Sequence, residues 1–514
     1  MNAWLRSIRR EIKVLIDSNA FKKGNHTPSD DDEVLPTTVR YKVKINSEGK
    51  VDKLKCRIAV RGDLQQSIND TDLWSGVVNT KTVKIFLCRA AKLKKQVIQI
   101  DFVGAFLQAR VKQRLFVTLP AEFESYFPEF KDYFGKPQLL DKAMYGTSIA
   151  SKCWNEDLTE YFTKSAGFSQ SSVDSSLFIK RLPDGKYIEL ILYVDDAMMF
   201  FDSDQTKEEF FKDLKTRFVF NILGHAHWFL QMRIHRYDDG SYSLDQMRYT
   251  LFLLDKNCPT NSPWGRPLHR DSPAPPKYAF TKDNQPKNDE EHKAIKDKYP
   301  GLQMSSAVCS LLYLAMGTRC DILWIVNKLA KSCKHPGMED FHALMWCFGY
   351  LRKYIDRGIK FYNNHEESSV HMICDKMNLK SDGLIGFSDS SWHDCSDTGR
   401  STTGYKIFYR GTIVDSNSSM PTPISMSTAE AEYMAAALCC MTLAHFRSLQ
   451  YDFENLGTKE YDVNKEFKDT PVMLLVDNSA TVDMSKNYKQ TKKNRHIARR
   501  FHYVRQGTQM NIHK

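Results

Sequence analysis

The chain has 514 residues, of which 42% are hydrophobic and 26% are charged. These values are ordinary for a globular protein, and the length allows about two to four domains with buried cores. The 73 Lys and Arg against 62 Asp and Glu give a net charge of +11, which fits a polyanionic partner without identifying one. The sequence shows no signal-peptide pattern and no charge-free apolar run of membrane-spanning length, so we expect a soluble, intracellular protein without a membrane partner.

The 12 cysteines do not indicate a zinc site or a disulfide framework. They form no CxxC pair, and no Cys/His group has the spacing of zinc ligands. In a chain of this size they are typical of reduced thiols packed inside a cytosolic or nuclear protein.

The N-terminal third predicts alternating helices and strands. We expect an amphipathic helix over residues 1–20 and a polar loop over 21–37. Strands follow in VRYKVKINSEGKVDKLKCRIAVRG, where SEGK suits a hairpin turn. Helical periodicity over 80–95 precedes the strand QVIQIDF, and 140–167 predicts a further helical region.

The remainder of the chain predicts a hairpin, a linker, helices and a second α/β unit. A hairpin over 189–201 precedes a helix over 205–218 and strands in WFLQMRIHRYDDGSYSLDQ. Residues 260–300 are rich in Pro, Lys, Asp and Asn and predict a linker or extended loop. Residues 303–356 are strongly helical in pattern, and an α/β unit begins near 383 and runs to the end.

Two adjacent aspartates, Asp195 and Asp196, interrupt the apolar run ELILYVDDAMMFF. Burial of one unpaired carboxylate costs on the order of several kcal/mol, and two neighbouring carboxylates also repel each other. One interpretation places the pair in an exposed hairpin turn, where Asp is common. The other places it in a cleft where bound divalent cations neutralise it. The absence of Gly, Asn or Pro beside the pair weakens the first interpretation.

Asp101 favours the second interpretation, because it also ends an apolar strand, just before Gly104, Ala105 and Phe106. Three carboxylates from two adjacent strands can hold two Mg²⁺ ions about 3.5–4 Å apart, which suits in-line phosphoryl displacement. Hard oxygen ligands without His or Cys favour Mg²⁺ over zinc.

The Tyr-x-Asp-Asp hairpin with an upstream strand-terminal Asp resembles the palm of a reverse transcriptase. More specifically, the chain resembles the reverse transcriptase and ribonuclease H region of the Pol polyprotein of copia-type LTR retrotransposons. Matching segments occur in the family's order: KCRIAVRGDLQQ, QIDFVGAFLQ, LLDKAMYG with Trp154 following, GFSQSSVDSSLFI, YVDD, LDQMRYTLFLL and SSAVCSLLYLAMGTRCDILWIVNKLAK. The resemblance spans nearly the entire chain, and the order of the segments makes it more specific than YVDD alone.

The resemblance implies that Asp101, Asp195 and Asp196 are catalytic residues that bind two Mg²⁺ ions. The ions would activate the primer 3′-hydroxyl, clamp the incoming triphosphate and stabilise the pyrophosphate leaving group. The chain departs from the family at Thr147-Ser148-Ile149, where Leu-Lys-Gln usually follows Tyr-Gly. The missing Gln would pack near the nascent base pair, so its absence bears on fidelity or full activity rather than on the fold.

The resemblance also implies substrate-binding residues. Phe106 matches the bulky position that excludes a ribose 2′-hydroxyl, and ordinary core packing is the alternative. Lys55, Arg57 and Arg61 resemble basic residues of the fingers that meet the triphosphate or the template, and surface solvation is the alternative. Tyr193 of the YVDD motif is a further candidate.

A second acidic cluster follows near the C-terminus. Asp389 ends a short strand in LIGFSDSSWHD, Glu430 and Glu432 lie in the first turns of STAEAEYMAAALCC, and Asp477 ends the strand in VMLLVDNSATV. Singly, these residues could be a strand-end polar residue, a helix N-terminal acid or an N-cap. Their order on strand, helix and strand resembles ribonuclease H, and GRSTTGY and NRHIARRFHYVRQG match its copia-type version.

This resemblance implies that Asp389, Glu432 and Asp477 bind two further Mg²⁺ ions. Glu432 is preferred over Glu430 because EYMAA resembles the family's continuation of the catalytic helix. In the family a further strand and a short helix with a fourth carboxylate follow, so we expect a domain truncated at its C-terminus.

The segment Lys486–Lys514 contains nine Lys and Arg and no Asp or Glu. Such a run is often a solvated face. Interleaved with Tyr488, Phe501 and Tyr503, it could also bind duplex phosphates in a sequence-independent, salt-sensitive manner.

We therefore expect a mixed α+β and α/β multidomain protein: a right-hand polymerase of fingers, palm and thumb, followed by a ribonuclease H-like domain. The expected ranges are 1–260 for the polymerase, 261–375 for a linker and helical connection, and 376–514 for the ribonuclease H-like domain. The expected partners are an RNA template, a DNA primer, dNTPs and an RNA–DNA hybrid, met in the cytoplasm (including virus-like particles) or the nucleus. Two alternatives stay open: a decayed or co-opted remnant that binds nucleic acid without catalysis, and a nuclease with the palm as scaffold.

Overall fold

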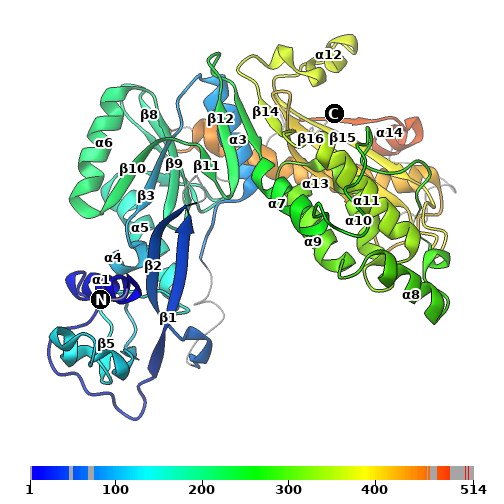
Figure 1. The fold of residues 1–514 in the computed structure, drawn as a ribbon. Coiled ribbons are helices and arrows are strands. Elements are labelled where there is room, and N and C mark those ends of the chain that lie inside the picture. The colour runs from blue at the N-terminus through cyan, green and yellow to red at the C-terminus, as the bar shows by residue number, and fades with distance from the viewer. Residues whose placement is uncertain are drawn as a thin grey trace. The chain divides into compact units, whose positions relative to one another are not determined.

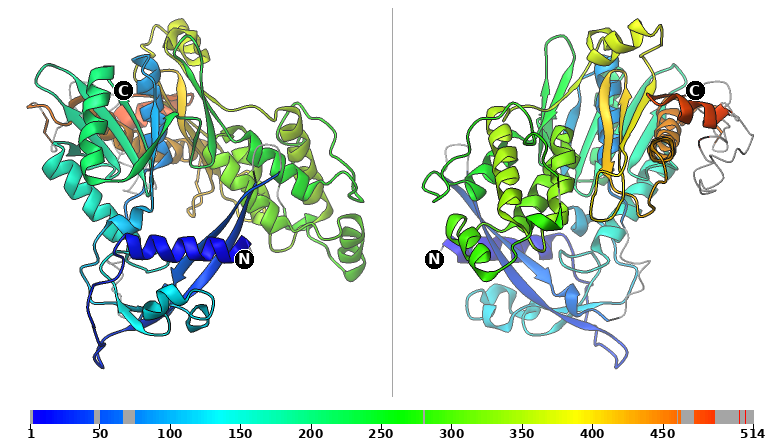
Figure 2. Two further views of the ribbon diagram at one scale, coloured as in Figure 1. Left: turned by 60° about the vertical axis from the view of Figure 1, so that its left-hand side comes forward. Right: turned by 90° about the vertical axis from the view of Figure 1, so that its right-hand side faces the viewer.

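The computed structural model describes residues 3–45, 50–66, 75–279, 281–459, 461–462, 472–486, 504 and 508. Contacts between residues divide the chain into two compact units (Figures 1 and 2). The first unit contains residues 1–78, 98–224 and 456–459, and the second contains 79–97, 225–455 and 460–514. No helix in the described ranges is both long and apolar enough to cross a bilayer.

A four-stranded sheet with strand order β2-β1-β4-β5 forms one half of the first unit. Its elements are α1 (Ala3–Asp17), β1 (Val34–Ile45), β2 (Val51–Val60), β4 (Phe116–Thr118) and β5 (Pro137–Leu139), with short 3₁₀ turns η1 (Gly62–Leu64), η2 (Ala121–Phe123) and η3 (Pro128–Tyr133). β1 and β2 form the long antiparallel hairpin seen in Figure 1. The predicted turn SEGK falls largely on residues 46–49, which lie outside the described residues.

Alternation along β2 explains why this hairpin has one apolar and one basic face. Cys56, Ile58 and Val60 are buried in a core that also contains Ile12 of α1. Successive side chains of a strand point to opposite faces, so Lys55 and Arg57 point away from that core. The helix expected over residues 1–20 is confirmed as α1.

A six-stranded sheet with order β10-β3-β9-β8-β7-β6 forms the other half of the first unit. Its strands are β3 (Ile98–Phe102), β6 (Ser169–Gln170), β7 (Leu177–Arg181), β8 (Tyr187–Tyr193), β9 (Asp196–Phe201) and β10 (Phe220–His225). The helices are α4 (Ala105–Gln108), α5 (Ala150–Glu160) with a π-helical turn η4 (Tyr161–Ser165), and α6 (Asp204–Arg217). The helix predicted within 140–167 thus begins only at Ala150.

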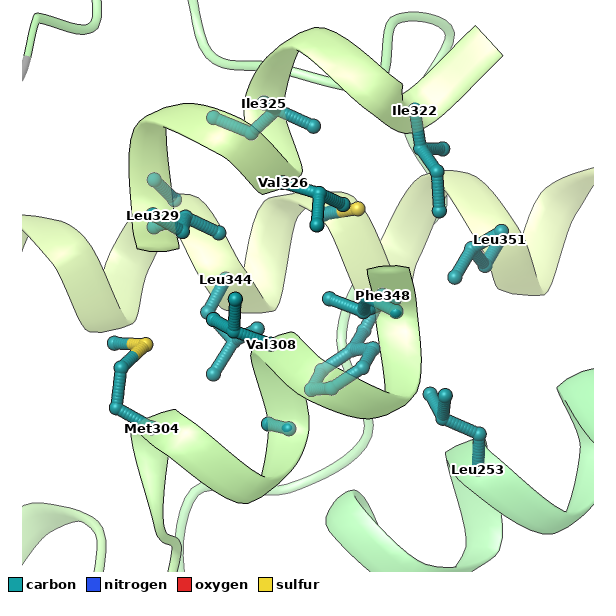
Figure 3. Close-up of a cluster of buried hydrophobic side chains, with 14 of the residues drawn as sticks. Leu253, Met304, Val308, Ile322, Ile325, Val326, Leu329, Leu344, Phe348 and Leu351 are labelled. Atoms are coloured by element: carbon teal, nitrogen blue, oxygen red, sulfur yellow. The ribbon is translucent and has the colours of Figure 1, made fainter. Parts of the chain in front are cut away.

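The second unit begins with helices and a small sheet. Its first elements are α3 (Thr80–Lys92), β11 (Trp228–Phe229), β12 (Met232–Arg236), β13 (Tyr242–Asp245), β14 (Ile359–Phe361), α7 (Met247–Asn257), α8 (Asp289–Lys298), α9 (Met304–Gly317), α10 (Leu323–Ser332), α11 (Met338–Lys353) and α12 (Ser369–Lys376), with 3₁₀ turns η5 (Lys282–Asn284), η6 (Cys320–Ile322) and η7 (His365–Glu367). Leu253, Val308, Val326 and Phe348 bring α7, α9, α10 and α11 into one apolar core (Figure 3). The helices expected over 303–356 are therefore present.

The prediction of a linker or extended loop over 260–300 is wrong at its end, where α8 forms. The side chain of Asn288 caps this helix by accepting a hydrogen bond from the backbone N–H of Glu291. Acidic residues in the first turn and lysines in the last complement the helix dipole. A single buried residue, Ile295, anchors α8 to the core, and one anchor leaves too little apolar periodicity to detect in the sequence.

A four-stranded sheet with order β17-β16-β15-β18 completes the second unit. Its elements are β15 (Leu384–Ser391), β16 (Thr402–Tyr409), β17 (Thr412–Ser419), β18 (Met473–Val476), α13 (Thr428–Asn455) and α14 (Ser479–Lys486). β15 pairs with β18 in parallel and with β16 in antiparallel fashion. Helix α13 packs on β15 so closely that a Cβ at Gly386 would stand 2.7 Å from Sγ of Cys439.

Helix α3 belongs to the second unit although it lies early in the sequence, and the domain ranges 1–260, 261–375 and 376–514 stay a prediction. It is buried along most of its length within the second unit. Lys81 forms an ion pair of 2.9 Å with Asp415 of β17, and the Cys88 thiol lies 3.9 Å from the backbone oxygen of Tyr409. The chain is mixed α/β, as expected, and its assignment to fingers, palm, thumb and ribonuclease H stays a prediction.

Candidate active sites

The first candidate site centres on a strained turn between β8 and β9. Val194 and Asp195 form this turn, and Val194 has φ of 54°, a left-handed conformation that is rare for a β-branched residue. The indole N–H of Trp154 donates a hydrogen bond of 2.6 Å to the backbone oxygen of Val194. Phe102 and Phe218 hold the Trp154 ring by edge contacts with centroid distances of 5.1 and 5.6 Å. The aspartate pair therefore does lie at a hairpin turn, but a buried aromatic cluster fixes that turn.

The three aspartates of this site come together through the register of neighbouring strands. Asp101 of β3 is paired with Asp196 of β9, and Cα atoms in such antiparallel pairs lie about 4.5–5.5 Å apart. The backbone N–H of Phe102 donates a hydrogen bond of 2.8 Å to the backbone oxygen of Asp195. Gln99 donates through Nε2 to Oδ1 of Asp196 at 2.8 Å.

Burial and the repulsion of neighbouring acids disfavour the charged state of Asp101 and Asp196. The pKa of Asp196 is raised to about 6, mainly by burial; Asp101 and Asp195 contribute to the increase, and the hydrogen bond from Gln99 opposes it. Burial likewise raises the pKa of Asp101, with a contribution from Asp195, against nearby Lys55 and Arg57. A divalent cation would relieve this repulsion, so the donor set fits a hard metal ion such as Mg²⁺.

A basic pocket of about 580 Å³ lies on the outward face of the β1–β2 hairpin. Its lining residues are Arg40, Tyr41, Lys42, Lys44, Lys55, Arg57, Ala59 and Tyr145. Two of its cation pairs, Arg40 with Arg57 and Lys42 with Lys55, stand directly opposite each other in the strand register. Like charges in such positions are destabilising, and a bound polyanion would offset that cost. The pocket therefore suits phosphate groups.

Tyr145 links this pocket to Phe106, and sequence reasoning did not single it out. The guanidinium of Arg57 lies 4.1 Å from the centre of the Tyr145 ring. The same ring makes an edge contact with Phe106, with a centroid distance of 5.0 Å. Gly146 allows this placement, since its φ is 91° and a Cβ there would stand 2.2 Å from the backbone oxygen of Val60. In the sequence, Gly146 directly after Tyr145 was the one sign that the backbone comes close to another strand at this point.

Phe106 and the other predicted substrate residues occupy different surroundings. Phe106 is half-buried and packs on two apolar clusters, as the core-packing alternative expects. It also lies beside Tyr145. Tyr193 is exposed at the end of β8. Arg61 does not line the basic pocket but forms an exposed ion pair of 2.7 Å with Asp63. Of the three predicted cations, the structure thus brings only Lys55 and Arg57 into the pocket.

The segment that departs from the family is well packed. Ile149 is buried in the core beneath the β1–β2 hairpin. Ser148 donates its hydroxyl hydrogen to the backbone oxygen of Gly62 at 3.1 Å. The apolar residue in place of Gln is therefore consistent with its local surroundings.

The second candidate site is formed by Asp389, Glu432 and Asp477. Ser388 of β15 is paired with Val476 of β18, and these two strands are parallel. The next residue on each strand, Asp389 and Asp477, therefore lies at the same end of the pair. Glu432 reaches them from the second turn of α13. One side-chain oxygen from each residue lies within 4.8 Å of the others, and among the described residues this is the one group of three potential ligands that converge so closely.

The contacts of Glu432 leave one oxygen for a metal ion. Its Oε1 accepts hydrogen bonds from the backbone N–H of Ser390 at 3.0 Å and from the Ser390 hydroxyl at 2.8 Å. Its Oε2 is buried without a hydrogen-bond partner. Burial raises the pKa of Glu432, and Asp389 and Asp477 add to the shift against the bonds from Ser390. A buried acceptor without a partner beside two acids fits a divalent cation.

Glu430 has the structural role expected of a helix N-terminal acid, whereas Asp477 is not an N-cap. Glu430 takes part in the cap of α13: its N–H donates to Oγ of Ser427 at 3.2 Å, and its carboxylate accepts from the N–H of Met426 at 2.6 Å. The N-cap of α14 is Asn478, whose side chain accepts from the N–H of Thr481, so Asp477 is not the cap. Glu430 thus has a structural role, and Glu432 faces the other acids.

A pocket of about 590 Å³ adjoins the second site. Asp389 and Asp477 line it together with apolar side chains that include Trp324 and Phe387. The basic run Lys486–Lys514 lies almost entirely outside the described residues, so its proposed contact with nucleic acid stays a prediction.

Comparison with known proteins identifies relatives over nearly the entire chain. Residues 25–264 match the family described as reverse transcriptase (RNA-dependent DNA polymerase). The Retrovirus-related Pol polyprotein from transposon TNT 1-94 of Nicotiana tabacum is 26% identical over 91% of this chain and 32% of its own length. The corresponding polyprotein from transposon RE1 of Arabidopsis thaliana is 27% identical over 98% of this chain and 31% of its own length.

A more distant relative is the Transposon Ty1-LR3 Gag-Pol polyprotein of Saccharomyces cerevisiae, which is 22% identical over 95% of this chain and 26% of its own length. The chain therefore spans about a third or less of the length of these relatives. These findings confirm the resemblance to the Pol polyprotein of copia-type retrotransposons, and the match to the reverse transcriptase family lies within residues 25–264.

Proposed function

We propose that the chain is an RNA-directed DNA polymerase that also cleaves RNA in RNA–DNA hybrids. The observation that carries the first activity is the pairing of Asp101 with Asp196 beside the Asp195 turn, inside the segment that matches the reverse transcriptase family. The proposed substrates are dNTPs, a DNA primer and an RNA or DNA template. The proposed cofactor is Mg²⁺, two ions at each site.

The residues around the first site have separate roles in nucleotidyl transfer. Asp101, Asp195 and Asp196 would hold Mg²⁺, which when bound activates the primer 3′-hydroxyl and neutralises charge on the triphosphate. Lys55 and Arg57 bind phosphate oxygens from the basic pocket. Phe106 and Tyr145 present an aromatic wall to the sugar of the incoming nucleotide. Trp154 keeps the Asp195 turn in place through its bond to Val194.

The second site supports hydrolysis of a phosphodiester bond. Asp389, Glu432 and Asp477 would hold Mg²⁺, and Ser390 orients the Glu432 carboxylate toward them. The adjoining pocket gives a strand access to the acids. Recognition of the hybrid by its geometry and 2′-hydroxyls would make the cleavage independent of sequence.

A noncatalytic remnant would not be expected to keep these arrangements. Decay replaces carboxylates as readily as other residues, yet six acids form two centres with raised pKa values for Asp101, Asp196 and Glu432. The comparisons give no support to that alternative.

Primer extension tests the polymerase proposal directly. Poly(rA)–oligo(dT) with Mg²⁺ should be extended by the wild type and not by Asp195→Asn. Asp184→Asn is a matched control, because Asp184 lies in the β7–β8 turn of the same sheet and pairs with Lys186 at 2.8 Å. Binding of the hybrid without extension by the wild type would instead support the remnant.

Release of labelled RNA from a hybrid tests the nuclease proposal. Asp477→Asn should abolish the release, and Asp483→Asn on the exposed face of the neighbouring α14 should not. Equal release by Asp477→Asn and the wild type would contradict the assignment.

A further inference from the structure

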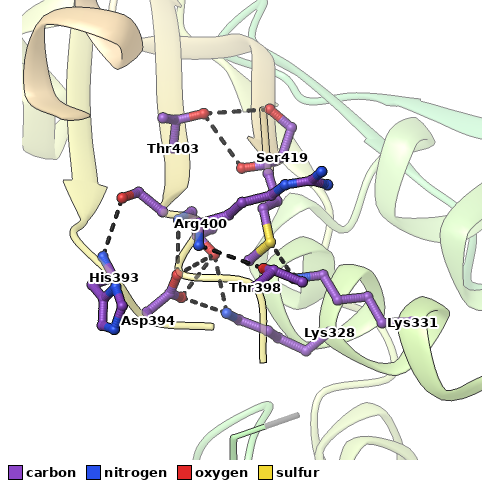
Figure 4. A network of polar contacts seen from close by, with 11 residues as sticks. Lys328, Lys331, His393, Asp394, Thr398, Arg400, Thr403 and Ser419 are labelled. Carbon is purple, nitrogen blue, oxygen red and sulfur yellow. Dashed lines mark hydrogen bonds and ion pairs between the residues drawn. The ribbon is translucent and has the colours of Figure 1, made fainter. Parts of the chain in front are cut away.

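A polar network outside both acidic centres joins α10 to the turn that follows β15. Lys328 of α10 is only 4% exposed. Its ammonium donates hydrogen bonds to the Asp394 carboxylate and, at 3.0 Å, to the Thr402 hydroxyl (Figure 4). Asp394 in turn accepts from the backbone N–H of Thr402 at 2.8 Å. A lysine buried to this degree requires an anionic partner, so the pair fixes the position of the turn relative to α10.

Hydrogen bonds also join this turn to Ser425, in the segment that precedes α13. Trp392 donates its indole N–H to the backbone oxygen of Ser425 at 3.2 Å. The backbone N–H of His393 donates to Oγ of Ser401 at 3.1 Å, and the hydroxyls of Ser401 and Ser425 lie 2.6 Å apart. Ser425 directly precedes Met426, whose N–H is bound by Glu430 at 2.6 Å in the cap of α13.

Two of the three acids lie at the ends of this chain of contacts. Asp389 is on β15 just before the turn, and Glu432 is on α13 just after its cap. A shift of the turn therefore moves Asp389 and Glu432 relative to each other. Since a metal site depends on the convergence of its ligands, such a shift alters metal affinity.

We propose that Lys328 and Asp394 are positioning residues, through which helix α10 sets the geometry of the Asp389, Glu432 and Asp477 centre. This inference rests on the proposed nuclease function. Neither residue touches the reacting groups. Their role is to keep the turn after β15 in the position in which the three acids converge.

Another contact of α10 provides a matched control. Asn327, next to Lys328, donates its side-chain amide to the backbone oxygen of Ser418 on the edge strand β17. This bond also joins α10 to the sheet, but it does not involve the turn after β15. Loss of the Asn327 bond should therefore leave the acids in place.

The test measures Mn²⁺ binding by calorimetry in the full chain, with Asp101→Asn and Asp195→Asn present so that the second centre dominates. Lys328→Met should weaken binding about tenfold, the lower end of the range for residues that orient metal ligands. Asp394→Asn should do the same while it keeps the size of the side chain. Lys328→Arg should restore most of the affinity, and Asn327→Ala should leave it unchanged.

A double variant separates positioning from general loss of packing. If both residues act as one unit, Lys328→Met with Asp394→Leu should bind Mn²⁺ no more weakly than Lys328→Met alone. Circular dichroism and melting curves identify variants that do not fold, and Asp394→Asn carries the test if Lys328→Met is one of them.

The outcomes distinguish this inference from the function on which it rests. If adding Asp477→Asn does not reduce Mn²⁺ binding, the centre itself is wrongly assigned and both proposals fall. If Asp477→Asn removes binding but folded Lys328→Met and Asp394→Asn bind Mn²⁺ as tightly as the parent protein with Asp101→Asn and Asp195→Asn, only the positioning role is overturned.

Discussion

The two acidic centres are built in different ways. In the first, Asp101, Asp195 and Asp196 come from adjacent strands of one sheet and from the strained turn between two of them. In the second, Asp389, Glu432 and Asp477 come from two strands and a helix, and their oxygens already converge within 4.8 Å. The side chains of the second centre are therefore already converged in the structure, whereas we expect the first centre to close only around cations that bind with the substrate.

The pockets near the two centres also differ, one being basic and the other largely apolar. The first shares its unit with a pocket lined by five cations, which suits a small, highly charged substrate. The second adjoins a pocket with a largely apolar wall that includes Trp324 and Phe387. The two groups of acids thus lie in separate units and differ in how closely their side chains converge.

The largest expected effect tests whether the centres work independently. Asp101→Asn should lower primer extension by more than about 100-fold, because loss of a metal ligand exceeds the roughly 10–100-fold cost of losing an outer partner. Hybrid cleavage should persist. Asp389→Asn should show the reverse pattern in the same two assays, and loss of both activities in either variant would break the comparison.

The next effect concerns the basic pocket. Arg57→Gln should raise the apparent KM for dNTP about tenfold, since a hydrogen bond to a charged group contributes about 1.5–3 kcal/mol. Arg61→Gln is the control, because Arg61 pairs with Asp63 and does not line the pocket. Steady-state kinetics that showed equal KM changes for both variants would exclude a special role of the pocket.

A smaller effect is expected from the anchor of the strained turn. Trp154→Phe keeps an aromatic ring but removes the donor to Val194, which should destabilise the fold by about 1–2 kcal/mol. Primer extension should slow several-fold, as the turn no longer holds Asp195 in one place. Trp264→Phe removes a comparable bond to Asn257 in the second unit and should not affect extension.

The smallest effect is a gain in stability. Asp196→Asn should stabilise the metal-free chain by about 1 kcal/mol, because the carboxylate whose pKa is raised to about 6 no longer has to be buried beside Asp101 and Asp195. Urea unfolding in EDTA measures this change. The control Asp184→Asn should instead lower the stability, since the hydrogen bond from Lys186 favours the charged carboxylate and lowers the pKa of Asp184. A loss of stability in Asp196→Asn would show that the acids do not repel one another.

The sequence predicts those parts of the sites that depend on local pattern. Asp101 and the Asp195–Asp196 pair stand out because charge interrupts apolar strands, and strand ends are where sheets place functional side chains. The preference for Glu432 over Glu430 agrees with the geometry, although only the structure shows that Glu430 belongs to a helix cap.

Features that depend on distant contacts could not be predicted in this way. Tyr145 and Arg57 are far apart in the sequence, and their stacking requires the close backbone approach at Gly146. The left-handed turn at Val194 escapes prediction because no Gly or Asn marks it, and the Trp154 side chain that bonds to it lies 40 residues earlier in the sequence. The packing of α3 in the second unit depends on Asp415 and Tyr409, more than 300 residues further along the chain.

Anomalous diffraction from crystals grown with Mn²⁺, a primer–template and a nonreactive dNTP analogue tests the central claim most directly. We predict manganese peaks in contact with Asp101 and Asp195 at the first centre, and with Asp389, Glu432 and Asp477 at the second. A structure at saturating Mn²⁺ with ordered substrate but no manganese near Asp101 and Asp195 would contradict the claim that these acids form a polymerase centre.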